Sequence, residues 1–247
     1  MAREAARNGA RFVMTPEYTL MMDGSGRVMR ERALGASGEP ALPQLKALAA
    51  ELGVWFLIGS LTLKTGGDRI ANRSYLLDAE GGIVAAYDKI HMFDATLPDG
   101  TVIRESSAYK PGECAVTADT PWGRIGLSVC YDLRFPQLYR SLAHGGAIHL
   151  AVPSSFQRAT GKVHWHTLVK ARAIENACFV FAPAMCGEHP GNRRTYGHSL
   201  VVDPWGEVLA DGGEAPGIVY ADIDPDHVAK VRGMLPSLEH DRAFTTQ

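Results

Sequence analysis

Short apolar segments alternate along the chain with segments whose apolar residues recur at helical spacing. Residues 39–52 show the helical spacing most clearly, with leucines on one face and Gly53 as the expected C-cap. The short apolar segments are typical of the buried strands of α/β proteins. The pattern predicts strands over 11–14, 54–63, 114–117, 124–129, 147–152, 178–182 and 218–223, and helices over 39–52, 136–144, 161–177 and 224–233.

Four segments fall outside this pattern. Residues 1–10 predict the end of a helix, capped at Asn8-Gly9. Residues 21–38, rich in Gly, Ser and Arg, predict a surface loop. Residues 90–113 predict a long loop, of the kind that is usually functional or disordered. Residues 236–247 predict a polar tail.

One hairpin pattern occurs twice. Residues 72–89 predict two strands that turn at residues 80–82. The stretch SYLLDAEGGIVA (74–85) aligns with SLVVDPWGEVLA (199–210), with Ser, Asp, Gly and Ala at the same spacing. We interpret this as one hairpin used in each of two facing sheets with approximate internal symmetry. Chance similarity between two hairpins is the alternative.

The alternation of strands and helices indicates an α/β protein. A chain of 247 residues suits one layered domain, and no Ser/Pro-rich linker divides it. We therefore predict a single domain over residues 1–235, followed by a C-terminal tail over 236–247.

Composition excludes several classes of function. The net charge is −2 and no basic stripe occurs, which argues against nucleic acid or an anionic membrane as a partner. The four cysteines are too few for a disulfide framework, so we expect a reduced, cytoplasmic protein. No stretch approaches the roughly 20 apolar residues of a membrane span. The first twenty residues lack the apolar core of a signal peptide.

The segment from Gly123 to Pro136 carries the strongest chemical signal. An apolar strand runs into Cys130, and Pro136 opens a helix that stops at Gly145-Gly146. A thiol on such a strand-to-helix turn points away from the backbone towards solvent or substrate, as the serine of a nucleophile elbow does. The nearby helix N-terminus favours a thiolate. A buried structural cysteine is the alternative, and for most lone cysteines it is the better one.

Partners for a nucleophile occur elsewhere in the chain. Glu17, Lys89, Glu105 and Cys130 fall at or just beyond the ends of predicted strands, or in the long loop. In layered α/β folds such positions gather at one edge, where sites form. These groups suit acyl transfer, in which a carboxylate acts as the base, the thiol as the nucleophile and the ammonium as the group that stabilises the oxyanion. Charged residues at strand ends also occur simply because they meet water.

Five motifs resemble those of the nitrilase superfamily of carbon–nitrogen hydrolases. The likeness is best to the amidase-like branch that contains omega-amidase and deaminated-glutathione amidase, and it covers nearly the whole chain. The motifs are T-P-E-Y (15–18), Y-D-K-I-H-M-F-D (87–94), R-E-S-S-A-Y-K-P-G-E (104–113), C-Y-D-L-R-F-P (130–136) and Y-G-H-S-L-V-V-D-P-W-G (196–206).

The resemblance implies a role for each matching residue. Glu17 would be the general base, Lys89 the oxyanion-stabilising lysine and Cys130 the nucleophile. Glu105 looks like the family's second glutamate, which positions the substrate and the lysine. The backbone N–H of Tyr131 would complete the oxyanion site. These roles require no metal and no organic cofactor.

The resemblance also implies a fold and an assembly. Family members are four-layer α-β-β-α sandwiches, which agrees with the repeated hairpin, and they commonly dimerise, so we expect a homodimer or a higher homo-oligomer. The helices that begin at Pro136 and Gly161 are the expected interface. Family domains begin with a strand and a complete first helix, whereas this sequence starts inside that helix. We therefore expect either a start downstream of the natural one, which we favour, or a sheet without its usual first strand.

Several residues have weaker signals. Ser155 and Phe156 follow the strand next to Cys130 and are candidates for the acyl pocket, although a helix-entry turn explains them nearly as well. Asp132 and Arg134 are expected to form a structural ion pair, with a substrate clamp as the alternative. The H-x-H at 164–166 matches none of the stronger zinc patterns, so we expect packed or solvated histidines and no metal site.

The expected activity is hydrolysis of a small amide to a carboxylate and ammonia through a cysteine thioester. An N-carbamoyl hydrolase or a nitrilase on the same centre is the nearest alternative, and the sequence does not name the substrate. A metal-dependent amidohydrolase would need clustered ligands, and a papain-like peptidase would need a histidine partner. A catalytically silent binding protein on this fold is the remaining alternative.

Overall fold

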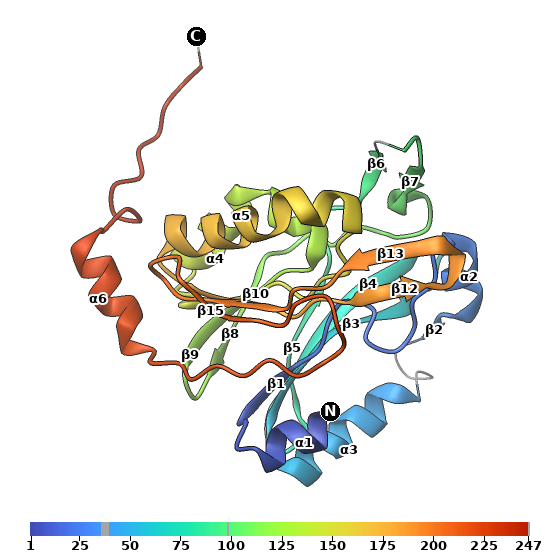
Figure 1. Ribbon diagram of the computed structural model, residues 1–247, viewed down its shortest axis with the longest axis horizontal. Coiled ribbons are helices and arrows are strands. Elements are labelled where there is room, and N and C mark those ends of the chain that lie inside the picture. The colour runs from blue at the N-terminus through green and yellow to red at the C-terminus, as the bar shows by residue number, and fades with distance from the viewer. Residues whose placement is uncertain (36–39, 98, 247) are drawn as a thin grey trace.

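Two β-sheets lie face to face in the computed structural model, which describes residues 1–35, 40–97 and 99–246 (Figure 1). In the first sheet, one parallel pair is followed by two antiparallel pairs. Its spatial order is β1 (Phe12–Met14), β3 (Trp55–Lys64), β4 (Ile70–Leu77) and β5 (Ile83–Asp88), with β2 (Leu34–Gly35) also paired to β3.

The second sheet has six strands, of which the central pairs β9–β10 and β10–β11 are parallel. Its spatial order is β15 (Val208–Asp211), β14 (Leu200–Val202), β11 (Phe179–Ala182), β10 (His149–Ala151), β9 (Gly123–Leu127) and β8 (Val116–Thr120). Parallel neighbours need a crossover connection, and helices supply it on the outer face.

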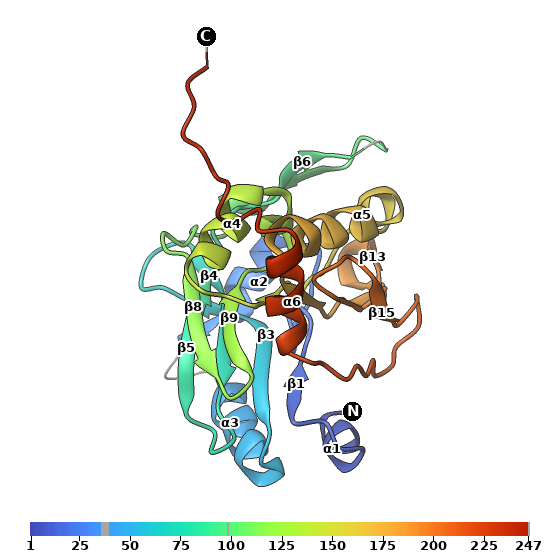
Figure 2. The same ribbon diagram turned by 90° about the vertical axis from the view of Figure 1, so that its left-hand side faces the viewer.

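Helices cover the outer face of each sheet and complete a four-layer α-β-β-α sandwich (Figures 1 and 2). The first sheet carries α1 (Ala2–Arg7) and α3 (Ala41–Leu52), and the second carries α4 (Pro136–His144) and α5 (Arg158–Asn176). The predicted fold class is confirmed. At one end of the sandwich lies α6 (Asp226–Met234), and the last residues extend away from it (Figure 1).

Strand β3 shows why the central strands read as continuous apolar runs. Leu57 packs in the core between the two sheets, together with Ile125 of β9. Its neighbours Phe56 and Ile58 pack on the other face, in a cluster with Ala49 of α3. Because both faces of the strand are buried, successive positions are apolar instead of alternating with polar ones.

The two matching hairpins have the same structure, one in each sheet. Both β4–β5 and β14–β15 are antiparallel, and their registers shift at equivalent points, after Leu76 in one and after Val201 in the other. In each turn an aspartate side chain, Asp78 or Asp203, accepts two backbone N–H groups. The interpretation of the sequence repeat as internal structural symmetry is therefore confirmed.

The prediction of a loop over 21–38 was wrong for part of the segment. Residues 26–32 form helix α2, capped by the Ser25 side chain, which accepts the N–H of Val28. Met29 is its one buried residue, so the helix lacks the apolar periodicity that would reveal it. Residues 36–38 of the predicted loop, and the predicted helix start at Glu39, lie outside the described residues.

Two other expectations need correction. Residues 90–113 contain the projecting hairpin of β6 (Asp94–Thr96) and β7 (Val102–Arg104), followed by the 3-10 helix η1 (Glu105–Ser107). Residues 218–223 form no strand, although Ile218 packs against the core cluster of the first sheet. An apolar run indicates burial, but it does not by itself supply a hydrogen-bonding neighbour.

Candidate active site

Cys130 lies on a tight turn between a strand and a helix, as predicted. Strand β9 ends at Leu127, and Cys130 begins the 3-10 helix η2 (Cys130–Arg134), which leads into α4. The residue has φ of 50°, in the left-handed region that non-glycine residues rarely adopt. Its N–H donates to the carbonyl of Pro153 at 3.0 Å. Such strain persists where the surroundings fix it, and it is common at functional sites.

Asp132 holds this turn against the segment that carries Lys89. Its buried carboxylate accepts the N–H of Val129 at 2.8 Å and the hydroxyl of Tyr87 at 2.7 Å. The other carboxylate oxygen accepts the N–H of His91 at 3.0 Å and lies 2.7 Å from Nδ1 of the same residue. The expected ion pair with Arg134 does not form within the described residues, because these groups already surround the carboxylate.

Arg134 instead faces the aromatic residues around the cysteine. Its guanidinium lies 5.2 Å from the ring centre of Phe156 and 5.9 Å from that of Tyr131. Both are cation–π distances. A cationic group therefore lies beside Tyr131 and Phe156, the two aromatic residues that the sequence suggested for substrate binding.

Glu17 enters the site from the end of β1. The Thr15–Pro16 segment crosses β3 at Gly59, where an added Cβ would lie 2.0 Å from the Thr15 carbonyl oxygen. Only glycine allows this close approach. The Glu17 side chain, fully buried, is then held by three donors at 2.8–3.0 Å: the Asn72 amide, the Lys89 ammonium and the Ser155 N–H.

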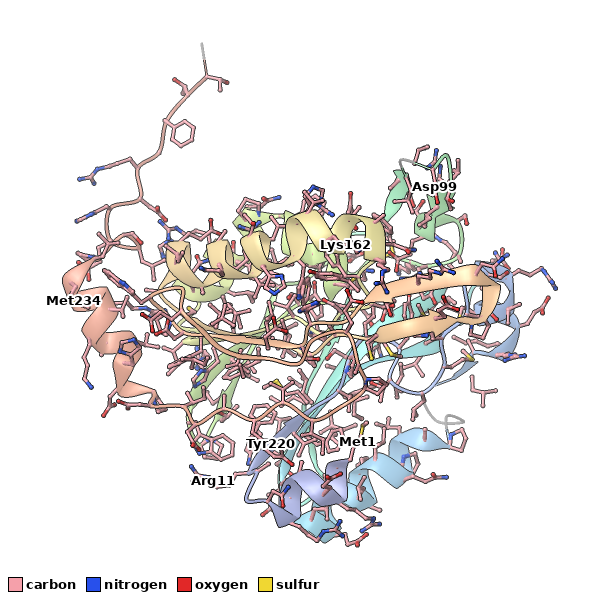
Figure 3. The ribbon with its side chains drawn as sticks, viewed as in Figure 1. Met1, Arg11, Asp99, Lys162, Tyr220 and Met234 are labelled. Carbon is pink, nitrogen blue, oxygen red and sulfur yellow. The ribbon has the colours of Figure 1, made fainter. Side chains whose placement is uncertain are left out.

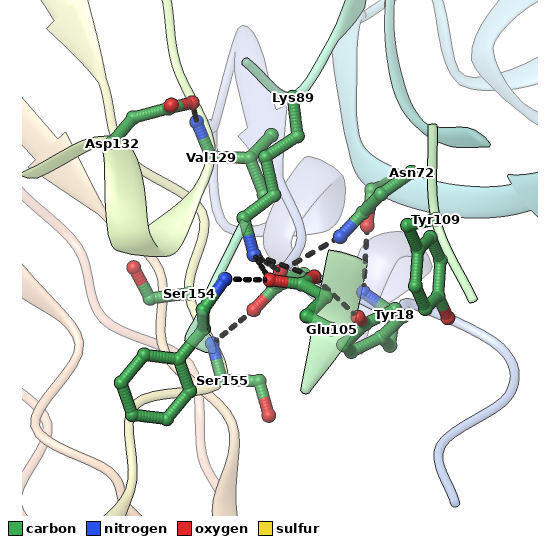
Figure 4. Close-up of polar contacts among 12 residues, drawn as sticks. Tyr18, Asn72, Lys89, Glu105, Tyr109, Val129, Asp132, Ser154 and Ser155 are labelled. Carbon is green, nitrogen blue, oxygen red and sulfur yellow. Dashed lines mark hydrogen bonds and ion pairs between the residues drawn. The ribbon is translucent and has the colours of Figure 1, made fainter. Parts of the chain in front are cut away.

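Lys89 contacts both predicted glutamates, and Figure 4 shows its contact with Glu105. Its ammonium lies 3.0 Å from Glu17 Oε1, and 2.8 and 2.9 Å from the carboxylate oxygens of Glu105. Glu105 also accepts the Phe93 N–H at 2.5 Å and the Tyr18 hydroxyl at 3.2 Å. Burial alone lowers the pKa of Lys89, but Glu105 and Glu17 outweigh it and hold the pKa above its ordinary value. The ammonium therefore stays charged.

The environment of the thiol departs from the sequence-based expectation. Burial raises the pKa of Cys130, the charge of Glu17 raises it further, and Lys89 only partly opposes them. The nearby helix start therefore does not produce a standing thiolate. The thiol therefore keeps its proton in the resting protein, and Glu17 is a carboxylate whose charge acts on the pKa of this thiol.

One cavity of about 660 Å³ contains every residue that the sequence suggested for the site. These lining residues are Glu17, Lys89, Glu105, Cys130, Tyr131, Ser155 and Phe156. The N–H of Tyr131 has no hydrogen-bond partner among the described residues and is free to bind an oxyanion.

The lining of the cavity is rich in cations. Arg27, Arg30, Arg104, Arg134, Arg158, Lys162, Arg193 and Arg194 line it, with Asp23 and Asp99 as the added acids. Lys162 on α5 and Asp99 on the β6–β7 hairpin lie on the same side of the molecule (Figure 3). A cavity with this excess of positive charge favours a ligand that carries negative charge.

Sequence reasoning missed three residues that shape the site. Asn72 donates to Glu17 and Tyr18 donates to Glu105. Arg193, from the hairpin of β12 (Cys186–His189) and β13 (Arg193–Tyr196), donates to the carbonyl of Ser155 at 2.8 Å. An asparagine at the start of the predicted hairpin was the one available signal, because a buried amide needs a polar partner.

Comparison with known proteins gives a consistent result. Residues 1–233 match the family model "Carbon-nitrogen hydrolase". The deaminated glutathione amidase of Yersinia enterocolitica is 39% identical over 238 residues, which are 95% of this chain and 83% of that protein.

Solved structures share the fold. The NitFhit protein of C. elegans superposes with a TM-score of 0.90 at 36% identity, covering 98% of this chain; the chain spans 59% of that protein's length. An amidase from Nesterenkonia sp. AN1 superposes with a TM-score of 0.79 at 26% identity, covering 95% of this chain and 88% of that one. In that structure acrylamide has added to the active-site cysteine.

Proposed function

The chain belongs to the carbon–nitrogen hydrolase family, and on this premise we propose that Glu17, Lys89 and Cys130 are its catalytic triad. It hydrolyses the C–N bond of a small amide to a carboxylate and ammonia through a cysteine thioester. The observation that carries the triad is the Lys89 ammonium, which bridges Glu17 and Glu105 in the cavity that holds Cys130. In this proposal Glu105 positions the lysine.

The first half of the proposed reaction forms the thioester. Glu17 takes the proton of the Cys130 thiol while sulfur attacks the amide carbon. The carbonyl oxygen becomes an oxyanion between the Lys89 ammonium and the Tyr131 N–H, which stabilise its charge. Glu17 then returns the proton to the leaving nitrogen, the C–N bond breaks, and ammonia departs.

The second half consumes water. Glu17 takes a proton from a water molecule while the oxygen attacks the thioester carbon, and the same two donors stabilise the second oxyanion. The C–S bond breaks, sulfur recovers a proton from Glu17, and the product leaves as the carboxylic acid, which loses its remaining proton to water and becomes the carboxylate. Because burial keeps the pKa of the free thiol high, each cycle depends on a base at this position.

We propose that the substrate carries a carboxylate in addition to its amide. Arg134 and Arg193, with the other cations of the cavity, support this proposal because guanidinium groups pair with carboxylates in a planar fork. Deaminated glutathione, the substrate in the names of the matched relatives, has this chemistry. Ser155 and Phe156 would line the acyl part of the cavity.

We also propose a cytoplasmic homodimer that associates through α4 and α5. All four cysteines are free, in keeping with a reducing compartment. Exposed apolar side chains on α5, Val163 and Ile174, support its use as an interface. No helix in the described part of the chain is long and apolar enough to cross a membrane. Sedimentation of the full chain tests the assembly.

Cys130→Ala tests the triad and the activity together. Ammonia release from deaminated glutathione should fall by at least about 10⁴-fold, because no other group can form the thioester. Intact-mass analysis of the wild-type protein mixed with substrate should show an acyl adduct that the variant lacks. Cys178→Ala is the matched control, since this thiol is also buried but does not line the cavity. Retained turnover in Cys130→Ala would contradict the proposal.

A further inference from the structure

A second group of ionisable side chains lies outside the cavity, on the outer side of the second sheet. His166 projects from α5, His198 precedes β14, and Asp211 ends β15. His166 Nε2 lies 3.1 Å from Asp211 Oδ2, and His198 Nδ1 lies 2.9 and 3.0 Å from the two carboxylate oxygens. None of the three residues lines the catalytic cavity.

The arrangement matches what a divalent transition metal requires. The three ligand atoms all lie within 4.8 Å of one another. Zinc binds imidazole nitrogen and carboxylate oxygen at about 2.0–2.2 Å, so two ligand atoms of one ion are at most about 4.4 Å apart, when they lie on opposite sides of it. The contacts near 3 Å already lie in this range. Small side-chain rotations would therefore replace the shared protons with an ion.

The three side chains offer suitable ligand atoms and are accessible to solvent. The Asp211 carboxylate accepts the Gly213 N–H at 2.9 Å, and its oxygens lie 2.9–3.1 Å from one ring nitrogen of each histidine. The exposed side-chain fractions of His166, His198 and Asp211 are 36%, 20% and 34%, which leaves room for an ion and water. Imidazole and carboxylate together are common zinc ligands.

We propose that His166, His198 and Asp211 bind one divalent transition metal ion, with zinc as the best match, and that water completes its coordination. This departs from the sequence-based expectation of no metal site. That expectation considered the pair at 164 and 166, whereas the fold uses only His166 and takes the other ligands from two distant segments. Sequence spacing within one helix does not reveal such a site.

The ion would fasten α5 to the β14–β15 hairpin. These elements already pack together, since α5 contacts β14 and the Trp165 indole N–H donates to the His198 carbonyl at 2.8 Å. His198 has φ of 56°, so its backbone is held in a strained conformation that presents the ring to Asp211. The expected consequence is stability of this layer, because a ligand of the folded state alone raises its stability.

Titration of the full chain with Zn²⁺ and with Co²⁺ tests the site without an activity readout. We expect Zn²⁺ to raise the Tm of the wild-type protein and Co²⁺ to produce the visible absorbance of a low-coordinate ion. His166→Ala, His198→Asn and Asp211→Asn should each weaken binding by at least about tenfold. Asparagine tolerates the left-handed backbone of His198. The amide introduced by Asp211→Asn keeps an oxygen that can accept the Gly213 N–H, as the carboxylate does.

His227→Ala is the matched control, since His227 pairs with Asp203 but belongs to no group of three possible metal ligands among the described residues. It should bind both metals as the wild type does. The proposal is overturned if wild-type Tm and absorbance do not change, or if the three variants bind as tightly as the wild type. A near-ultraviolet thiolate–Co²⁺ band would also overturn it, by assigning the ion to a cysteine such as the exposed Cys114.

Discussion

The two halves of the sandwich follow the same path and have different chemistry. β1, α3, β3, β4 and β5 in the first half correspond to β10, α5, β11, β14 and β15 in the second, with one parallel and two antiparallel pairings in each. In each half, the residue after the first strand donates its N–H to a carbonyl of the neighbouring strand. Thr15 donates to Leu57, and Val152 donates to Phe181.

The halves differ in the residues just beyond the ends of these strands. Two residues beyond Thr15 stands Glu17, and two beyond Val152 stands Ser154. Extending the aligned hairpins by four residues pairs Lys89 with Glu214, a side chain that is 45% exposed and bound to Arg158. Glu17 and Lys89 are 0% and 2% exposed. The comparison teaches that the scaffold is shared, whereas reactivity requires buried charges that face the thiol.

The largest expected difference between the two halves is in kcat, and it is measured by comparing Glu17→Gln with Ser154→Ala. Loss of the general base should lower kcat about 10²- to 10⁴-fold. Ser154 lies outside the cavity lining, and within the described residues its hydroxyl donates only to the Val152 carbonyl, so Ser154→Ala should leave kcat within about threefold. Steady-state ammonia release measures both. Equal losses in the two variants would show that position in the repeat, and not charge, matters.

Thiol alkylation in Glu17→Gln separates two effects of opposite sign. The charge of Glu17 raises the pKa of Cys130, so its removal alone would speed reaction with iodoacetamide at neutral pH. Loss of the proton acceptor slows it, and we expect the slowing to dominate. The rate should then climb only above the ordinary thiol pKa of about 8.5, because burial still raises the value.

The next largest expected difference is between Lys89→Met and the equivalent Glu214→Gln, in both unfolding free energy and kcat. Without the ammonium, Glu17 and Glu105 are buried and unpaired, which should cost about 3–5 kcal/mol of unfolding free energy. The lost oxyanion donor should lower kcat about 10²- to 10³-fold. Glu214→Gln removes an exposed pair with Arg158 and should cost at most about 1 kcal/mol. Urea unfolding and ammonia release measure the two quantities.

The pH dependence of the Lys89 effect has a definite sign. Because the pKa of Lys89 is raised in the folded state, its ion pairs contribute fully below the ordinary lysine pKa of about 10.4. The stability difference between wild type and Lys89→Met should be constant from about pH 7 to about pH 10 and shrink above that. A difference that already vanishes at neutral pH would contradict the charged bridge.

Asp78→Ala and Asp203→Ala give the smallest effect and sharpen the shared part of the comparison. Each removes a carboxylate that accepts two turn N–H groups, so each should cost about 1–3 kcal/mol of unfolding free energy. Asp203→Ala should cost slightly more, because Asp203 also pairs with His227 at 3.3 Å. Thermal unfolding measures both, and neither should change kcat.

The sequence by itself determined the local features: the strand-to-helix turn at Cys130, the repeated hairpin and the apolar strands buried on both faces. Each follows from residue types at short range, so pattern and motif were enough. Helix α2, the β6–β7 hairpin and the unpaired segment 218–223 were missed because their local pattern lacked the usual period or their pairing depended on a distant neighbour.

Only the tertiary structure decided how the charges act on one another. Glu17 and Lys89 are 72 positions apart in the chain, yet their side chains lie 3.0 Å apart. The raised pKa of Cys130 and the grouping of His166 with Asp211 depend on burial and separation in space. Electrostatic interactions depend on distance and on the exclusion of water, and both are set when the layers pack together.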